Sequence, residues 1–226
     1  MRFSAYRGRQ ARSYNRVWRR FTRVTLDHTL ALVDDAALMA LTANRAGQPL
    51  RLLDVACGTG ALLTRLLERF PLAEATGVDA SADMLAEARR ALDALPDARG
   101  RSTRLLVATL AAGPTAGLPF APASFDLITC SNALHYLPDP VGALAGLRAL
   151  LAPGGQLVVE DYAQRSAPFP WAPFEWLIRR VDSGHVRAYT CAEAGAFVAS
   201  AGFAIAASET FAVDWLWQGW ALRAVM

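Results

Sequence analysis

A carboxylate followed by a glycine loop is the first feature of this sequence that could do chemistry. Residues 52–60 read LLDVACGTG, with Asp54 after an apolar run and Gly58 and Gly60 in the loop. A dinucleotide-binding loop has the spacing G-x-G-x-x-G, but Leu63 stands where the third glycine is required. A carboxylate here would repel a pyrophosphate and attract an ammonium group. A structural strand-to-helix turn without a ligand is the alternative, because G-x-G alone is a weak signal.

A second carboxylate, Asp79, follows Gly60 by 19 positions and ends the next predicted strand, in the stretch GVDAS. In other doubly wound sheets an acid at this place accepts both hydroxyls of an adenosine ribose and disfavours a 2′-phosphate. Met84 can lay its flexible thioether on an adenine, although a methionine here is more often part of the core. The two acids together indicate a zwitterionic adenosine ligand such as S-adenosylmethionine.

The elements around these acids alternate short apolar runs with helical patterns, which predicts βα units and a parallel sheet. Strands are predicted at 50–56, 75–79, 104–108, 125–130, 156–161, 203–213 and 219–225. Helices are predicted at 60–70, 82–95, 141–151 and 191–201, and Pro153-Gly154-Gly155 is predicted to turn the chain from the third helix into the next strand. No internal repeat or linker is visible, so residues 1–226 are predicted to form a single domain.

The composition argues against several classes of protein. No run of about 18 uncharged apolar residues is present, so no membrane span is predicted, and the first 24 residues lack the apolar region of a secretory signal. The three cysteines, Cys57, Cys130 and Cys191, are scattered along the chain. This spacing argues against a disulfide framework or a metal site and favours a cytoplasmic location.

The positive charge of the chain is concentrated at its N-terminus. Eight of the 23 basic residues precede the first acid, Asp27, and every one of the 23 is arginine. A basic N-terminus can serve in targeting or bind an anionic partner, but we interpret this one as a solvated helical face. The rest of the chain has no basic run with interleaved aromatic residues, so no nucleic-acid partner is predicted.

Several motifs, in order and spacing, resemble the class I S-adenosylmethionine-dependent methyltransferases, and among them the small-molecule enzymes similar to quinone C-methylating enzymes. They are LLDVACGTG, GVDAS with Met84, GLPFAPASFDLITCSNALHYLPDP at 117–140 and LLAPGGQLVVEDY at 150–162, with weaker matches in HVRAYT at 185–190 and ASAGF at 199–203. The resemblance implies an α/β fold with a Rossmann-like, doubly wound sheet and helices on both faces. Its seven strands would follow the order 3-2-1-4-5-7-6, with the last strand antiparallel. It also implies S-adenosyl-L-methionine as cofactor and S-adenosyl-L-homocysteine as product.

The resemblance assigns roles to individual residues. It implies that Asp54 reaches the amino group of the cofactor and that Asp79 holds its ribose. The other implied cofactor contacts are Ala56, Gly58, Gly60, Ala80, Met84, Leu110 and Ser131. Thr109 stands where many relatives carry an acid for the adenine amino group, so that contact falls to its hydroxyl or is lost. Tyr14 and Asn15 partly match a Tyr-Asp pair in the helix that covers the cofactor, and residues 1–48 are predicted to be this helical cover.

Methyl transfer is an in-line displacement, so a base is needed only where the acceptor must lose a proton. His135 and His185 are the candidate catalytic residues, ahead of Tyr189 and Glu160. His135 follows the fourth strand at the carboxyl edge of the sheet, where ligands bind, but its ring could equally pack on the cofactor. His185 could contact the substrate, although an ordinary surface histidine is the favoured interpretation.

The aromatic segment 162–189 is predicted to be an insertion that forms a lid over the substrate. Trp171, Trp176 and Tyr189 are its candidate substrate contacts, since pockets for small molecules are mostly apolar. The same rings could instead pack onto the domain. Trp215, Trp217 and Trp220 are expected in the terminal strands and the core, or in a homodimer contact.

The sequence therefore predicts methyl transfer to a small, apolar or aromatic acceptor, with no metal. Two alternatives stay open. One is an aminopropyl or other alkyl transferase on the same fold, which commonly adds acids for a polyamine substrate. The other is a cofactor-binding subunit without catalytic activity, which the missing acid at Thr109 slightly favours.

Overall fold

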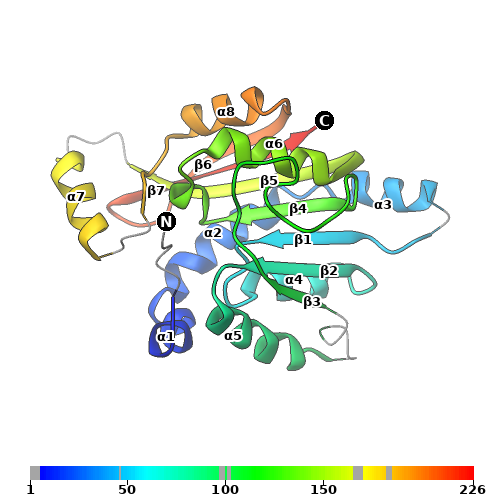
Figure 1. Cartoon of the computed structure of the whole chain (residues 1–226), viewed down its shortest axis with the longest axis horizontal. Helices are drawn as coiled ribbons and strands as arrows, with labels where there is room; N and C mark the ends of the chain where they lie inside the picture. The colour runs from blue at the N-terminus through cyan, green and yellow to red at the C-terminus, as the bar shows by residue number, and fades with distance from the viewer. Residues whose placement is uncertain (1–5, 46, 97–99, 101–102, 165–169, 182–184) are drawn as a thin grey trace.

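The computed structural model describes the chain except residues 1–5, 46, 97–99, 101–102, 165–169 and 182–184, and Figure 1 shows its layout. Seven strands form one sheet in the order β3-β2-β1-β4-β5-β7-β6. The strands are β1 (Arg51–Val55), β2 (Glu74–Asp79), β3 (Arg104–Val107), β4 (Phe125–Ser131), β5 (Leu151–Gln164), β6 (Ala204–Ala212) and β7 (Trp217–Val225). The pairs among β1 to β5 are parallel, and β7 is antiparallel to both β5 and β6. The predicted fold class and strand order are confirmed.

Eight α-helices and one 3-10 turn are present in the described part of the chain. They are α1 (Arg9–Val17), α2 (Arg19–Ala31), α3 (Asp35–Asn44), α4 (Ala61–Arg69), α5 (Ala82–Asp93), η2 (Leu134–Tyr136), α6 (Pro140–Leu150), α7 (Trp171–Val181) and α8 (Cys191–Ser200). None of them is long and apolar enough to cross a membrane.

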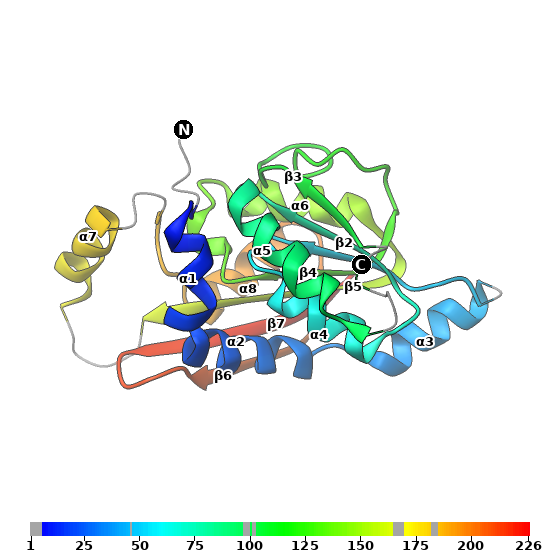
Figure 2. The same ribbon diagram turned by 90° about the horizontal axis from the view of Figure 1, so that it is seen from below.

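The core lies on both faces of the sheet because the central strands are apolar on both sides. On β1, Leu52 packs with side chains of α2, α3 and α4, whereas its neighbour Leu53 packs on the opposite face with side chains of α6 and α8. Figure 2 shows α4 and α8 on the two sides of the strands. This double covering explains the long apolar runs that marked the strands in the sequence.

The fifth strand begins earlier than predicted. Leu151 already pairs with Phe125 of β4, and the next pair joins Gln156 to Leu127. Residues 152–155 therefore bulge out within β5, and the predicted turn at Pro153-Gly154-Gly155 is an irregularity inside the strand. The glycines permit this bulge because Gly154 has a positive φ of 79°.

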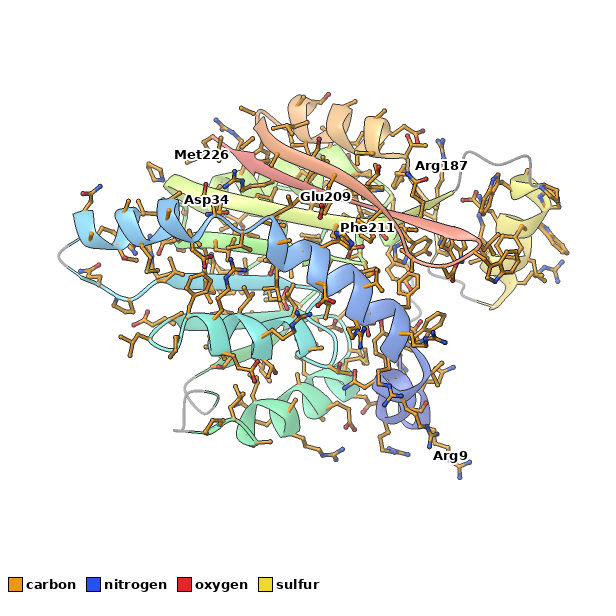
Figure 3. All side chains as sticks on the ribbon, turned by 180° about the vertical axis from the view of Figure 1, so that it is seen from behind. Arg9, Asp34, Arg187, Glu209, Phe211 and Met226 are labelled. Carbon is orange, nitrogen blue, oxygen red and sulfur yellow. The ribbon has the colours of Figure 1, made fainter. Side chains whose placement is uncertain are left out.

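The N-terminal helices contact β6 and β7, at one edge of the sheet, through polar groups and stacked rings. His28 of α2 stacks on Phe211 of β6 with ring centroids 3.7 Å apart, and its Nδ1 lies 2.8 Å from Glu209 Oε1. Figure 3 labels Glu209 and Phe211 on β6, next to α2. Asp34, at the start of α3, forms an ion pair with Arg223 of β7. These contacts fix α2 across the sheet.

Candidate functional site

A cavity of about 640 Å³ opens at the carboxyl edge of the parallel strands. Its wall includes residues at or just after the ends of β1, β2, β3, β4 and β5, together with residues of α1, α2, α7 and β7. This is the edge of an open α/β sheet at which ligands bind. Of the predicted site residues, the wall contains Tyr14, Asp54, Ala56, Gly58, Asp79, Ala80, Met84, Thr109, Leu110, Ser131 and His135.

Asp54 holds a buried carboxylate against this cavity. Its Oδ1 accepts a hydrogen bond of 2.7 Å from Thr129 Oγ1, whereas its Oδ2 is buried and has no partner among the described residues. Burial raises the pKa of Asp54 to about 7, against the lowering effect of the Thr129 hydrogen bond. A buried oxygen without a partner is costly unless a ligand supplies a donor. The ammonium group of a zwitterion would be such a donor, so this observation fits S-adenosylmethionine.

Asp79 shapes the glycine loop as well as facing the cavity. Its Oδ2 accepts a hydrogen bond of 2.9 Å from the Gly58 N–H, and its Oδ1 accepts one of 2.8 Å from the Ser81 N–H. Burial raises the pKa of Asp79, and these two hydrogen bonds oppose that rise. A carboxylate oxygen has more than one lone pair, so both oxygens can still accept from a ribose.

The two glycines of the loop have different roles. Gly58 has a φ of 53°, and a Cβ there would lie 3.3 Å from Met84 Cε in the cavity wall. Gly60 has a φ of 74°, and a Cβ there would lie 3.0 Å from the Ala88 Cβ of α5. Gly60 is not itself in the cavity wall, although its neighbours Thr59 and Ala61 are, so its implied cofactor contact stays a prediction. Its absent side chain lets α4 begin close against α5.

The first part of the N-terminal segment contributes residues to the cavity wall. Tyr6, Tyr14 and Trp18 lie in the wall, whereas α3 packs on β4 and β5 away from the cavity. Thr59 Oγ1 donates a 2.6 Å hydrogen bond to Asn15 Oδ1 of α1. Burial raises the pKa of Tyr14 above its ordinary value. Among the described residues of the predicted 1–48 cover, none from 32 onward is in the wall.

His135 lies in the cavity wall and forms a pair with Asp161, which the sequence analysis did not single out. His135 Nδ1 lies 2.8 Å from Asp161 Oδ1, and the His135 N–H donates to Asp161 Oδ2 at 2.9 Å. A carboxylate accepts hydrogen bonds, so the imidazole proton belongs on Nδ1 and leaves Nε2 as the basic nitrogen. This is the arrangement of a general base whose tautomer is fixed by an acid.

His185 is buried behind the wall, so the favoured surface interpretation is wrong. Its Nδ1 lies 3.1 Å from the hydroxyl of Tyr162, and the two rings are parallel with centroids 6.2 Å apart. Its Nε2 lies 3.8 Å from Glu175 Oε1 on α7. Tyr162 is in the cavity wall, whereas His185 is not. His185 is therefore connected to the cavity through the Tyr162 hydroxyl and through the His135 ring, whose centroid lies 5.6 Å from its own.

Glu160 and Tyr189, the weaker candidates for a base, also lie outside the wall. Glu160 is fully buried, and its Oε2 accepts a 3.0 Å hydrogen bond from Asn132 Nδ2. Burial raises the pKa of Glu160. Tyr189 is buried against Phe197, and its carbonyl accepts a 2.8 Å hydrogen bond from the Trp220 indole. The predicted substrate contact at Tyr189 is therefore wrong, because this residue belongs to the core.

The aromatic insertion does reach the cavity, but with residues other than those predicted. Phe174, Leu177 and Ile178 of α7 are in the wall, at the i, i+3, i+4 spacing of one helix face. Trp176 points away from that face and is 57% exposed. Trp171 is half-buried beside Trp217, with ring centroids 5.4 Å apart, and is not in the wall either. Residues 165–169 and 182–184 of the predicted lid lie outside the described residues.

Trp217 lies in the terminal strand β7, where it was expected, and is also a wall residue. Its ring lies 4.8 Å from that of Tyr162 and 5.9 Å from that of Phe174. Trp220 is in the core, as expected, and Trp215 is 79% exposed. Of the three tryptophans that were candidates for a homodimer contact, Trp217 and Trp220 are therefore not exposed on the surface. The described residues contain no group of three or more His, Cys, Asp or Glu side chains that could hold a metal ion.

Comparisons with known proteins agree with this geometry. A family model described as a methyltransferase domain matches residues 53–157. The chain is 38% identical over 144 residues to the ubiquinone/menaquinone biosynthesis C-methyltransferase UbiE of Paracoccus denitrificans, covering 64% of this chain and 52% of that protein. It is 42% identical over 114 residues to a demethylmenaquinone methyltransferase of Thermus thermophilus, covering 50% of this chain and 48% of that protein. The chain thus spans about half the length of these relatives.

Solved structures share the fold at low identity. The geranyl diphosphate C-methyltransferase of Streptomyces coelicolor, solved with S-adenosyl-L-homocysteine, has a TM-score of 0.62 at 15% identity, over 84% of this chain and 77% of that chain. The methyltransferase CalH, also solved with this product, has a TM-score of 0.61 at 21% identity, over 80% of this chain and 52% of that chain. Sheet order, family model and relatives agree, and together they support a class I S-adenosylmethionine-dependent small-molecule methyltransferase.

Proposed function

We propose that this chain transfers a methyl group from S-adenosylmethionine to a small aromatic acceptor that carries an acidic hydroxyl group. The observation that carries the proposal is one cavity whose wall contains two chemically different groups, which we call the cofactor end and the acceptor end. The first is the unpartnered Asp54 carboxylate oxygen beside the glycine loop, and the second is the imidazole of His135 held by Asp161. The first end suits a zwitterionic nucleoside, and the second suits an acceptor that must lose a proton.

The cofactor end would be held by charge and shape. Asp54 would accept from the ammonium group, Asp79 from the ribose hydroxyls, and Met84 would pack on the adenine. Thr109 lies in the wall at the adenine end and carries no charge, so adenine recognition would rest on backbone groups and packing. When bound, S-adenosylmethionine supplies an electrophilic methyl group on a sulfonium.

At the acceptor end the protein would orient the acceptor and accept its proton. His135 Nε2 takes the hydroxyl proton, and Asp161 stabilises the resulting imidazolium. The oxygen lone pair then increases the electron density of the adjacent ring carbon, which becomes the methyl acceptor. The ring C–H proton would then be lost to water, which restores the aromatic ring, and the His135 imidazolium would return its proton to the acceptor oxygen. The rings of Phe21, Tyr162, Phe174 and Trp217 would hold a planar acceptor and exclude water.

A hydroquinone is the acceptor class that these features favour. The wall is mostly apolar, and the curated relatives are named as methyltransferases of quinone biosynthesis. An aminopropyl transferase is less well supported, because Asp54 and Asp79 are the only acids among the described wall residues and both lie at the cofactor end. A single domain over residues 1–226 and a cytoplasmic location complete the proposal.

The test uses S-adenosylmethionine with a labelled methyl group and three acceptors: a hydroquinone, its dimethyl ether and a polyamine. Label on a ring carbon of the hydroquinone alone is the expected result. Label on the polyamine, or on the dimethyl ether, would contradict the proposal. Calorimetric titration separates the remaining cases. Binding of S-adenosylmethionine without any transfer would identify a cofactor-binding subunit, and equal binding of NAD would overturn the interpretation of the glycine loop.

A further inference from the structure

Exposed tryptophan and aliphatic side chains from three separate elements lie at the end of the molecule where the cavity opens. Trp18 lies between α1 and α2, Trp176 and Leu177 lie on α7, and Trp215 lies in the turn between β6 and β7. All four are exposed. Figures 1 and 2 show α1, α7 and this hairpin turn at the same end of the molecule, beyond the carboxyl ends of the parallel strands. Trp18 and Leu177 are also in the cavity wall, so the exposed surface continues into the cavity.

The same end carries a strong positive charge. All seven arginines between residues 7 and 23 are exposed, and no acid occurs between residues 6 and 26. Within the part of the chain that the structure describes, none of these arginines forms an ion pair. Figure 3 shows Arg9 extending away from the body of the protein. On α7, the Arg180 guanidinium lies 4.6 Å above the Trp176 ring.

Arginines without ion pairs, together with exposed tryptophans, are the pattern of proteins that lie on an anionic membrane surface. Tryptophan is favoured at the level of the lipid headgroups, and each basic residue near an anionic bilayer adds to the attraction. A nucleic acid would also attract the arginines. However, the exposed Val17 and Leu177 have no aromatic face on which a base could stack. The mixture of aliphatic and aromatic side chains therefore favours lipid.

We propose that this end of the protein, formed by α1, α7 and the β6–β7 turn, docks on a bilayer that contains anionic lipids. In that orientation the cavity mouth faces the membrane, and a lipophilic acceptor can pass from the bilayer along Trp18 and Leu177 without crossing water. Entry of the acceptor rests on the proposed function, whereas docking does not. The arginines supply the long-range attraction, and the exposed apolar side chains supply the contact.

The test is sedimentation of the full chain with vesicles, without cofactor or acceptor. The vesicles contain phosphatidylcholine alone or with about 30% phosphatidylglycerol, at about 0.1 M and about 0.5 M salt. Binding to the anionic vesicles only, and weaker binding at the higher salt, is expected. The triple variant Arg9→Gln, Arg12→Gln, Arg16→Gln should bind about 100-fold more weakly, because each charge contributes about 0.7 of a decade in affinity.

Two further variants separate insertion from simple charge attraction. Trp176→Ser combined with Trp215→Ser should weaken vesicle binding at least about tenfold. Leu72→Ser is the matched control, because Leu72 is 87% exposed at the opposite edge of the sheet, just before β2, and should leave binding unchanged. Equal binding by the tryptophan variant and the native chain would overturn the proposal, and so would tighter binding to duplex DNA than to anionic vesicles. Binding of S-adenosylmethionine is measured separately, so failure of docking is distinguishable from failure of the proposed function.

Discussion

Replacing Asp54 by asparagine should make the protein more stable and at the same time impair cofactor binding. The substitution keeps the oxygen that accepts from Thr129 Oγ1 and removes the charge from the Oδ2 position that has no partner. In the free protein, burial raises the pKa of Asp54 from 3.8 to about 7. A shift of about three units corresponds to a cost of about 4 kcal/mol for keeping the charge in the fold above pH 7.

This cost of about 4 kcal/mol is the upper limit of the gain in the free energy of unfolding, because the asparagine amide would still be a polar group in the cavity wall. We expect about half of it, or about 2 kcal/mol, and an increase in Tm of about 4–8 °C at pH 8. The dependence on pH follows from the direction of the shift. Between pH 4 and 7 the folded Asp54 holds more protons than the unfolded one, so its contribution to stability falls as the pH rises through this range. The advantage of the variant should therefore be full at pH 8 and nearly absent at pH 4.

The matched control is Asp126→Asn, at a second buried carboxylate. Burial disfavours the charge there too, but hydrogen bonds from Arg51 and the charges of Arg51 and Arg45 hold the pKa of Asp126 below its ordinary value. The same substitution should therefore destabilise the protein at pH 8. Thermal melts at pH 5 and pH 8 measure both variants. A lower Tm for Asp54→Asn than for the native chain at pH 8 would refute the reasoning.

The second half of this prediction concerns the affinity of the Asp54→Asn variant for S-adenosylmethionine. Loss of a charge-assisted hydrogen bond costs roughly 1.5–3 kcal/mol, so the Kd for S-adenosylmethionine should rise about 10–100-fold in Asp54→Asn. In the native chain the free carboxyl must lose its proton to bind an ammonium group below pH 7. Affinity should therefore fall about tenfold for each pH unit below that value. Calorimetry should show this slope in the native chain and not in the variant. Equal affinities at pH 8 would place the ammonium group elsewhere.

Three further substitutions test other parts of the site. His135→Ala should lower kcat about 100-fold with little change in cofactor Kd, and retention of most activity in His135→Phe would show that the ring only packs. Asp79→Ala should raise the Kd for S-adenosylmethionine at least about tenfold, since each charged hydrogen bond to the ribose is worth roughly 1.5–3 kcal/mol; calorimetry on folded protein measures it. Gly60→Ala should lower the free energy of unfolding by about 2 kcal/mol, because its φ of 74° disfavours a side chain and the Cβ would press on Ala88. Denaturant unfolding checks this value, and an unchanged midpoint would contradict it.

The parallel part of the sheet could be predicted from sequence because its strands are apolar on both faces and end in recognisable loops. The predicted strand at 75–79 matches β2 within one residue, and Asp54 and Asp79 both lie in the cavity wall as expected. Carboxyl ends of neighbouring parallel strands meet at one edge, so a residue near the end of a strand is placed almost by topology alone. The same rule could have paired His135, which follows β4, with Asp161 on β5.

The parts of the site that could not be predicted from the sequence are of two kinds. They depend on which face of a helix a residue occupies, or on pairing with residues that are distant in the sequence. In α7 the helix turns Phe174 toward the cavity and Trp176 toward solvent, and a shift of 100° per residue decides which ring faces inward. Trp217 enters the wall because β7 pairs antiparallel with β5 and brings it opposite Gln164, beyond Tyr162. Neither fact has a local signal, since aromatic residues in a strand are expected in the core.

The cover and the carboxylates of the cofactor end are linked through the loop between β2 and α5. Ser81 Oγ donates a hydrogen bond to the Tyr6 carbonyl, and the Gly8 N–H donates to Asp83 Oδ2 at 2.8 Å. The Ser81 N–H in turn donates to Asp79 Oδ1, so the residues that hold α1 are next to the acid that faces the ribose. A ligand that engages Asp79 would therefore restrict the anchor of α1 as well. Because α1 also carries exposed arginines, the positions of the cover and of the basic surface depend on the same few hydrogen bonds.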